Sequence, residues 1–259
     1  MNIQTNSRAL LAMALAMVLC AAAGGCRRAP DRLYASAEMG TKLIQVDVQE
    51  AGKITTKLIG QTGTVGCISM ALSPSGALNS MCGPGFGSPG PQQLAMIDLA
   101  TGSAKPFGTV VNGLTVMAMK FAPDGTLYAV GDSNPSSPTF NSLYTVDAST
   151  GAFTRIGSTS APAFFMDFAF DRGGTMYGAT SLALYTIDRK TAAATKVADF
   201  VGGSAIMGLA FGLEDKKLYA SDFKTPVSDL YTVDTRTGIL TPVAALGYAY
   251  SHNLVAAKR

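Results

Sequence analysis

The sequence contains one histidine, His252, and the next residue is Asn253. Asp167 and Ser69 occupy comparable places in two similar apolar segments, MDFAF and ISMAL. A carboxylate, an imidazole, an amide and a hydroxyl can bind a cation or a small polar ligand, and they can equally hold ordered water in a narrow channel. We therefore take Asp167, His252, Asn253 and Ser69 as the candidate ligand site.

Ser69, His252 and Asp167 also supply the side-chain types of a Ser-His-Asp hydrolase. The sequence has no G-x-S-x-G segment to place a serine on a strand-to-helix turn. Glycoside hydrolysis needs a pair of carboxylates at the scissile bond, and only Asp167 is present in this set. The sequence therefore assigns no catalytic residue and predicts no metal and no cofactor.

Two cysteines, Cys67 and Cys82, flank a turn at Pro74-Ser75-Gly76. If two antiparallel strands meet at that turn, the two cysteines face each other across the hairpin. Such a pair forms a disulfide in an oxidising compartment, and otherwise remains as two buried thiols. The C-x-x-C spacing of redox catalysts is absent. We predict a Cys67–Cys82 disulfide.

These residues lie within a repeat of short strands. Segments such as LYTVD and LYTID end on an aspartate and recur at intervals of about 40–50 residues, which is typical of β-propeller blades. The five repeat aspartates are Asp47, Asp98, Asp147, Asp188 and Asp234. An isolated aspartate at a strand end usually accepts hydrogen bonds from the following turn, so we interpret these residues as turn caps.

The repeat predicts an all-β fold, a five-bladed β-propeller of four-stranded antiparallel blades in one domain, residues 32–257. The first unit lacks an innermost strand, and the segment SHNLVA near the C-terminus matches one. We therefore expect the C-terminal strand to pair with the N-terminal strands and close the ring, which removes an exposed sheet edge. The expected blades are 67–108, 117–157, 165–200, 206–246, and 32–60 together with 249–257.

Alignment of the five innermost strands predicts what surrounds the axis. One column contains small or polar residues, namely Ser69, Ala118, Asp167, Gly208 and Asn253. The residue before each of these belongs to a second column, Ile68, Met117, Met166, Met207 and His252. Successive side chains in a strand point to opposite faces, so the two columns separate. Methionine adapts to irregular gaps, and we interpret the second column as packing.

The first 26 residues have the features of a signal peptide. Arg8 is followed by an apolar run from Ala9 to Ala23, too short for a confident membrane span. Gly24-Gly25-Cys26 resembles the lipobox of bacterial lipoproteins, whose cysteine is lipidated. This resemblance implies an exported protein anchored to the membrane through Cys26, at the outer membrane and facing the periplasm or the cell surface. The alternatives are an ordinary cleaved signal and an uncleaved anchor.

The charge balance narrows the class of partner. The chain has 20 Lys and Arg against 17 Asp and Glu, and only Arg8 of the basic residues precedes Cys26. Such a balance lacks the basic excess of a nucleic-acid-binding protein. The expected partners are the membrane, through the lipid anchor, and a protein, glycan or small-molecule ligand.

The segments LYTVDASTGAFTRIG and LYTVDTRTGILTPV resemble the repeats of bacterial extracytoplasmic propellers of the YVTN, NHL and quinoprotein-like groups. These groups include binding proteins and enzymes. The chain has no tryptophan, so the tryptophan-containing motif of quinone-dependent dehydrogenases is absent. The leading hypothesis is a non-enzymatic binding or scaffolding lipoprotein of the cell envelope. The alternatives are a lactonase-like or cyclotransferase-like hydrolase with an axial site around Asp167 and His252, and a lectin-like protein.

Overall fold

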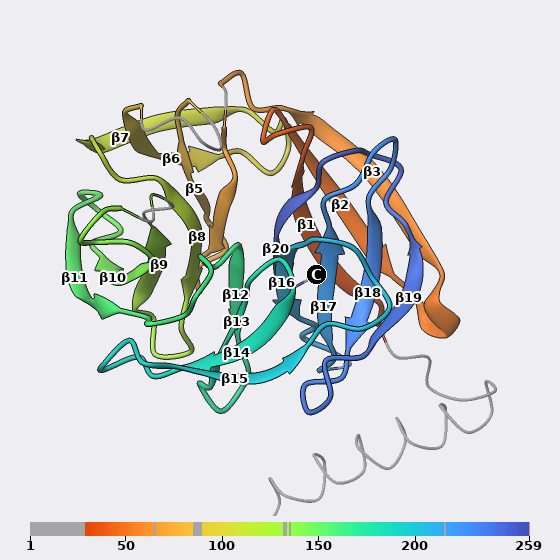
Figure 1. Ribbon diagram of the computed structural model, residues 1–259. Helices are drawn as coiled ribbons and strands as arrows, with labels where there is room; N and C mark the ends of the chain where they lie inside the picture. Colours follow the sequence, from red (N-terminus) through yellow and green to blue (C-terminus); the bar gives the residue numbers. More distant parts are fainter. Residues whose placement is uncertain are drawn as a thin grey trace, which may run out of the picture.

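The computed structural model describes residues 29–64, 66–84, 90–131, 134, 136–214 and 216–258. These residues form a ring of five four-stranded antiparallel sheets around a central axis, a five-bladed β-propeller (Figure 1). The fold class and the closure of the ring are therefore as predicted.

Each of the first four blades is built from four consecutive strands. Blade 1 consists of β4 (Ser69–Leu72), β5 (Leu78–Cys82), β6 (Gln92–Ile97) and β7 (Ala104–Val111). Blade 2 consists of β8 (Val116–Phe121), β9 (Leu127–Gly131), β10 (Ser142–Val146) and β11 (Phe153–Ser158). Blade 3 consists of β12 (Asp167–Phe170), β13 (Met176–Ala179), β14 (Ala183–Ile187) and β15 (Ala194–Asp199). Blade 4 consists of β16 (Ile206–Phe211), β17 (Leu218–Asp222), β18 (Asp229–Val233) and β19 (Leu240–Ala245).

Blade 5 joins the two ends of the domain. Its strands are β20 (His252–Ala257), β1 (Asp31–Ala37), β2 (Lys42–Val48) and β3 (Ile54–Gln61), with the 3-10 helix η1 (Glu50–Gly52) between the last two. The innermost strand β20 pairs antiparallel with β1, and Leu254 lies opposite Ala35. Because β20 supplies the strand that the N-terminal unit lacks, β1 is paired on both edges and the ring closes.

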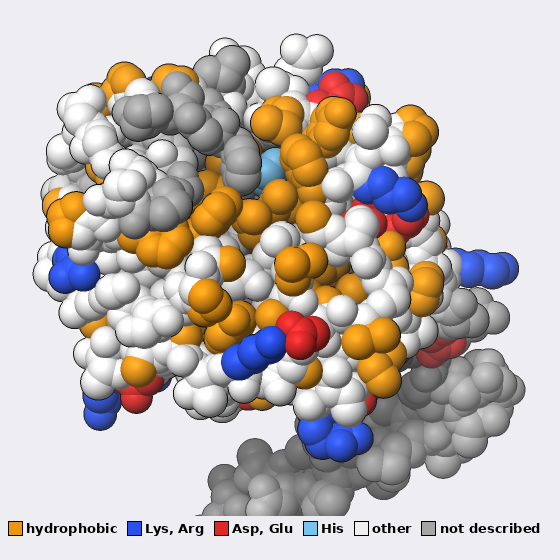
Figure 2. All heavy atoms as spheres, in the orientation of Figure 1, with side chains coloured by type: hydrophobic (Ala, Val, Ile, Leu, Met, Phe, Trp, Pro, Cys, Tyr) orange, Lys and Arg blue, Asp and Glu red, His pale blue; other side chains and the backbone are white. Residues whose placement is uncertain are grey.

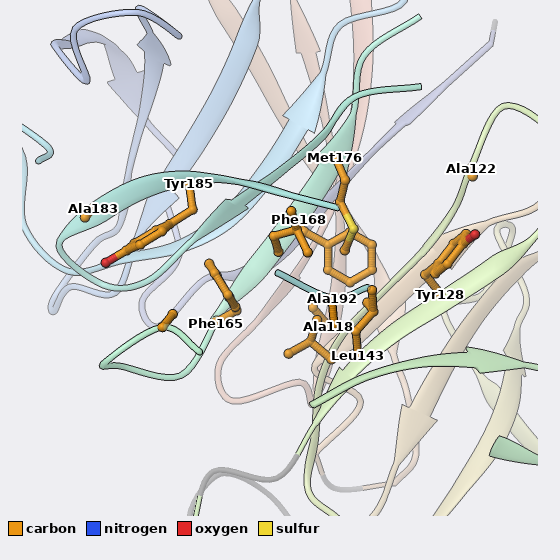
Figure 3. Close-up of a cluster of buried hydrophobic side chains, with 13 residues drawn as sticks. Ala118, Ala122, Tyr128, Leu143, Phe165, Phe168, Met176, Ala183, Tyr185 and Ala192 are labelled. Carbon is orange, nitrogen blue, oxygen red and sulfur yellow. The ribbon is translucent and has the colours of Figure 1, made fainter. Parts of the chain in front are cut away.

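The spaces between blades are filled by apolar side chains. Figure 3 shows the cluster between blades 2 and 3, to which both blades contribute. Phe165 and Tyr185 meet edge to face there, with ring centroids 5.4 Å apart. Edge-to-face pairs of this kind contribute about 0.5–1.5 kcal/mol beyond the burial of their area. The ladder hydrogen bonds run within each sheet, and a smaller number of bonds join neighbouring blades, such as Thr109 N to the backbone oxygen of Thr150 at 2.8 Å. Side-chain packing and these bonds together hold the blades.

Four of the five repeat aspartates cap turns, as interpreted from the sequence. Asp147 Oδ1 accepts hydrogen bonds from the backbone amides of Ser149 and Thr150 at 2.8 and 3.1 Å. Three other aspartates make the same pair of bonds, namely Asp98, Asp188 and Asp234.

Asp47 is the exception, and the interpretation was wrong for it. It lies inside β2, and its carboxylate pairs with Arg32 Nε at 2.9 Å and accepts a hydrogen bond from Gln45 Nε2 at 2.9 Å. A β-turn does not follow Asp47 directly, because β2 continues to Val48 and η1 follows. The carboxylate therefore bonds across the sheet to β1.

The predicted disulfide is present, with an S–S distance of 2.03 Å between Cys67 and Cys82. Within the hairpin, Ser69 lies opposite Met81. Continued without a break, this register would place Cys82 opposite Ile68, one residue away from Cys67. The next blade explains the offset, because Val116 lies opposite Gly131 beyond a β-bulge. Cys67 and Cys82 occupy the corresponding places in blade 1. The two cysteines therefore meet across the same irregularity.

The expected signal peptide and the lipidation site Cys26 lie outside the described residues. Within the residues that are described, no helix is long and apolar enough to span a membrane.

Removal of the disulfide tests its contribution to the stability of blade 1. The double variant Cys67→Val/Cys82→Ala keeps small apolar side chains at both buried positions. We expect its free energy of unfolding to fall by about 3 kcal/mol, since a bridge closing a loop of this length limits the unfolded chain. Urea unfolding of the variant and the unreduced wild type measures the difference. Two alkylatable thiols at Cys67 and Cys82 in the unreduced wild type would contradict the bridge.

Candidate functional site at the propeller axis

A buried ion pair lies at the centre of the axis. Lys120 Nζ of β8 is 2.5 Å from Asp167 Oδ1 of β12, and the Asp167 side chain is 0% exposed. The ammonium group also donates to the backbone oxygen of Met70 and to Asn253 Oδ1, each at 3.3 Å. An ammonium group has three N–H donors. The three acceptors therefore match its donor capacity.

Asp167 connects three further backbone groups to this pair. Its Oδ1 accepts a hydrogen bond from Phe168 N at 2.9 Å. Its Oδ2 accepts bonds from Leu209 N of β16 at 2.8 Å and from Leu254 N of β20 at 3.1 Å. One carboxylate thus ties together the innermost strands of blades 2, 3, 4 and 5.

Asn253 completes the polar cluster from the opposite side of the axis. Its Oδ1 accepts a hydrogen bond from Met70 N at 3.1 Å, and its Nδ2 donates to the backbone oxygens of Met117 and Met166 at 3.2 and 3.4 Å. Asn253 is the extra residue at an irregularity in the pairing of β20 with β1, and its φ is +36°. Asparagine tolerates the left-handed region better than most residues. This backbone conformation directs the amide toward the axis.

Close approach of the innermost strands requires small residues beside this cluster. A Cβ atom on Gly208 would lie 2.4 Å from Ser221 Oγ and 3.2 Å from Leu254 N. Glycine at this point therefore allows β16 to approach β20, and it brings Leu209 N within reach of Asp167.

Burial governs the ionisation of the pair. It raises the pKa of Asp167 to about 6, against the opposing effects of the Lys120 ammonium and the backbone donors. Burial also lowers the pKa of Lys120 from its ordinary value, again opposed by Asp167. The carboxylate is still mainly ionised at neutral pH. The site is a charged pair whose two members stabilise each other.

Of the four predicted site residues, the structure brings Asp167 and Asn253 together through Lys120. Ser69 is buried, and its Oγ accepts a hydrogen bond from Met81 N at 3.2 Å, within its own hairpin. His252 lies one residue before Asn253, and its imidazole packs edge-on to Phe223, with ring centroids 5.0 Å apart. Ser69 and Asp167 thus each bond to other groups, and the arrangement provides no activated serine.

His252 belongs to a ring of side chains at one mouth of the axis, which we call the mouth ring. Its members come from the five innermost strands or from the residues just before them: Ile68, Met117, Met166, Met207 and His252. Figure 2 shows the imidazole at the bottom of a hollow bordered by hydrophobic side chains. His252 is 2% exposed, and this burial lowers the pKa of its imidazole to about 4. The imidazole is therefore neutral at physiological pH.

The opposite end of the axis opens into a cavity, which we call the aromatic funnel. It has a volume of about 750 Å³. Its walls include one residue near the end of each innermost strand, and Lys120 also lines it: Leu72, Phe121, Phe170, Phe211, Ala256 and Lys120. The ion pair therefore lies between the mouth ring and the aromatic funnel.

Sequence reasoning missed Lys120, although a signal for it exists. Lys120 is the only charged residue in the segment VMAMKF, where the matching strands carry Ala71, Ala169, Ala210 and Val255. A lysine in a buried strand requires an acceptor. Lys120 lies two residues beyond Ala118, on the same face as the predicted polar column. Alternation together with the need for a counter-ion would have paired Lys120 with Asp167.

The variant Lys120→Met tests the ion pair. We expect the free energy of unfolding at pH 7 to fall by roughly 3–5 kcal/mol, because Asp167 remains buried without its cation. The loss should be smaller at pH 5, since the pKa of Asp167 rises further in the variant and the carboxyl group is then protonated. Urea unfolding at both pH values checks this. The exposed pair of Lys196 and Asp199 provides the control Lys196→Met, for which we expect little change in stability, since water screens such a pair. Equal losses of stability in Lys120→Met and Lys196→Met would contradict the prediction.

The variant His252→Met tests the buried imidazole. The pKa of His252 is lowered in the folded state, so the unfolded chain binds the extra proton first, and stability is lost as the pH falls from about 6.5 to about 4. Methionine occupies the matching place in three blades and does not titrate there. The wild type should therefore lose roughly 3 kcal/mol more of its free energy of unfolding over this pH range than the variant does. The pKa of Asp167 is raised, so its effect on stability over this pH range is opposite to that of His252. The quantity to measure is therefore the difference in free energy of unfolding between the wild type and the variant at each pH. Parallel pH profiles would contradict the prediction.

Solved structures of similar fold include several propellers. A putative 6-phosphogluconolactonase from Bacteroides fragilis NCTC 9343 is 12% identical with a TM-score of 0.52, covering 89% of this chain and 98% of that chain. A putative 6-phosphogluconolactonase from Bacteroides uniformis ATCC 8492 is 10% identical with a TM-score of 0.51, covering 89% and 100%. A putative gluconolactonase is 11% identical with a TM-score of 0.52, covering 87% and 81%. At these identities the likeness shows the fold alone.

No curated protein matches the chain. Residues 32–246 match the family described as "Repeat of unknown function (DUF6923)". The match begins in β1 and includes all strands of the propeller except β20. The chain therefore belongs to the family of repeats of unknown function DUF6923.

Proposed function

We propose that the protein is an exported propeller, lipid-anchored at Cys26, that binds a small ligand and does not convert it. The observation that carries the proposal is the division of the axis. Its central charged groups bond to one another and to the backbone, while an apolar cavity of about 750 Å³ lies beside them. Cavities of this volume and lining are typical of small-molecule sites.

The aromatic funnel favours a ligand with an apolar body and an anionic head. Phe121, Phe170 and Phe211 supply ring surfaces to its wall. Arg172 and Lys258 are exposed and also line the cavity, while Lys120 is neutralised by Asp167. Asp171 is the one acidic residue that lines it, and its carboxylate accepts a hydrogen bond from Thr175 N. The cations of the rim thus exceed its acids, which attracts a carboxylate or a similar head group.

The Cys67–Cys82 disulfide supports export, since such bridges persist in oxidising compartments. The lectin alternative has less support. Tyr128 and Tyr219, which recur in matching strands, are buried between blades and do not form exposed aromatic rims. Tyr177 packs against Phe211 of the neighbouring blade, with ring centroids 5.5 Å apart.

Lactone hydrolysis is the main enzymatic alternative, since several propellers of similar fold are described as putative lactonases. Hydrolysis at this axis would need Asp167 or His252 to reach a substrate. Asp167 is enclosed by Lys120 and backbone amides, and His252 lies at the other end of the axis from the funnel. This geometry favours binding over hydrolysis.

A single tryptophan placed in the aromatic funnel tests the proposal, because the chain has none. In the variant Phe121→Trp, we expect dodecanoate to change the emission of the tryptophan in a saturable way. Acetate lacks the apolar body and dodecylamine the anionic head, so both should have much weaker effects. Phe164→Trp, at the mouth ring, is the matched control and should not respond.

The variant Lys258→Glu, added to Phe121→Trp, reverses one rim charge at an exposed position. We expect it to weaken dodecanoate binding, with a difference that shrinks at high salt. Absence of saturable change, or equal change at Phe164→Trp, would overturn the funnel as the binding site. Turnover of δ-gluconolactone by the wild type that is lost in Asp167→Asn would favour the hydrolase instead.

A further inference from the structure

The mouth ring contains three thioethers and one imidazole at the same level of the axis. Met117, Met166 and Met207 form one buried cluster with Ile68, and His252 holds the matching place in β20. Ile68 shows that a side chain without sulfur packs at this level of the axis. Packing between blades therefore does not by itself require methionine at the other three positions. The ring therefore has a chemical character that differs from the rest of the apolar core.

Backbone irregularities hold two of these side chains at the mouth. Val116 and Ala118 pair with successive residues of β9, which leaves Met117 as the extra residue of a β-bulge. Ile206 and Gly208 do the same with β17, which leaves Met207 as another extra residue. Bulges re-aim side chains and are frequent beside functional sites.

Asn253 adds a second constraint from below the ring. Its Nδ2 donates to the backbone oxygens of both Met117 and Met166. The side chain of one innermost strand thus fixes the backbone of two ring methionines from other blades. The ring is preorganised by the same amide that binds Lys120.

The chemistry of the ring suits a soft monovalent cation. Thioether sulfur and neutral imidazole are ligands that favour Cu(I), while hard divalent ions prefer carboxylate and carbonyl oxygen. None of the five ring residues carries a carboxylate. The charges of Lys120 and Asp167 lie deeper on the axis and balance each other, so they leave no net charge below the ring.

The surroundings also favour such an ion. Phe164 and Phe223 are partly buried and pack against the ring, and Phe223 further contacts Tyr250, with ring centroids 4.8 Å apart. An aromatic collar limits access of water and of oxidants to a bound Cu(I). The imidazole is nevertheless visible in Figure 2, although His252 is only 2% exposed.

We propose that Met117, Met166, Met207 and His252 form a binding site for one Cu(I) or Ag(I) ion at the mouth of the axis. The site lies at the opposite end from the aromatic funnel and does not depend on the proposed function. Binding requires no redox step, since the ion enters and leaves in the same oxidation state.

Ag(I) is the probe of choice, because it needs no reductant and so leaves the Cys67–Cys82 disulfide intact. The full chain is used with Cys20→Ser and Cys26→Ser, which removes the other two cysteines. We expect calorimetry to show one equivalent of Ag(I), with Zn²⁺ and Ca²⁺ failing to compete. In protein labelled at the methionine methyl groups, three of the 12 methionines should shift on addition of Ag(I).

Leucine preserves the packing of methionine but removes its sulfur. The triple variant Met117→Leu/Met166→Leu/Met207→Leu should lose stoichiometric binding. A matched triple variant in the blade cores, Met81→Leu/Met119→Leu/Met176→Leu, should retain it, since these buried methionines lie outside the ring. His252→Leu should weaken binding by about tenfold or more.

Circular dichroism and urea unfolding verify that each variant is folded before it is titrated. Stoichiometric binding that survives in the ring triple, or methyl shifts at methionines outside the ring, would overturn the proposal. Absence of any binding by the wild type would reduce the ring to apolar packing and would also overturn it.

Discussion

The closed ring depends on the buried contact between Lys120 and Asp167. Burying two charges costs free energy, and an ion pair repays it only when the remaining donors and acceptors are also bonded. Here the ammonium reaches the backbone of blade 1 and the amide of blade 5, while the carboxylate reaches the backbones of blades 4 and 5. All five innermost strands meet this one cluster. An apolar axis would pack as densely, but it would not specify how the blades are set relative to one another.

The same contact separates the two ends of the axis. Because Lys120, Asp167 and Asn253 fill the centre, a ligand at the mouth ring and a ligand in the aromatic funnel do not share a chamber. The two ends also differ in chemistry, with thioethers and an imidazole at one and aromatic rings with a cationic rim at the other. The central cluster therefore serves structure, and both proposed binding sites lie at the mouths of the axis.

Much of this arrangement could be predicted because the repeat carries it. Strand alternation and the LYxxD spacing located the blades, the closure through β20 and the facing cysteines, and alignment of the innermost strands identified the column of Asp167 and Asn253. What escaped prediction lies where side chains reach across blades. Lys120 lies two residues beyond Ala118, the member of the polar column in its strand. Its four-carbon side chain extends back to reach Asp167. Asp47 departs from the other aspartates because Arg32, on the neighbouring strand, competes for its carboxylate. Neither contact repeats from blade to blade, so alignment of the repeats alone does not reveal it.

The departures from the repeat at the axis share one physical cause. Five identical blades would place five identical side chains at every level of the axis, and identical charges there would repel one another. A neutral polar cluster thus requires different residues in different blades, and the axis has one lysine, one aspartate and one asparagine in place of a five-fold set. The asparagine is the extra residue at the irregularity between β20 and β1, where its φ is +36°. A residue that breaks the five-fold set at the axis thus also breaks the regular strand pairing beside His252, the single histidine of the chain.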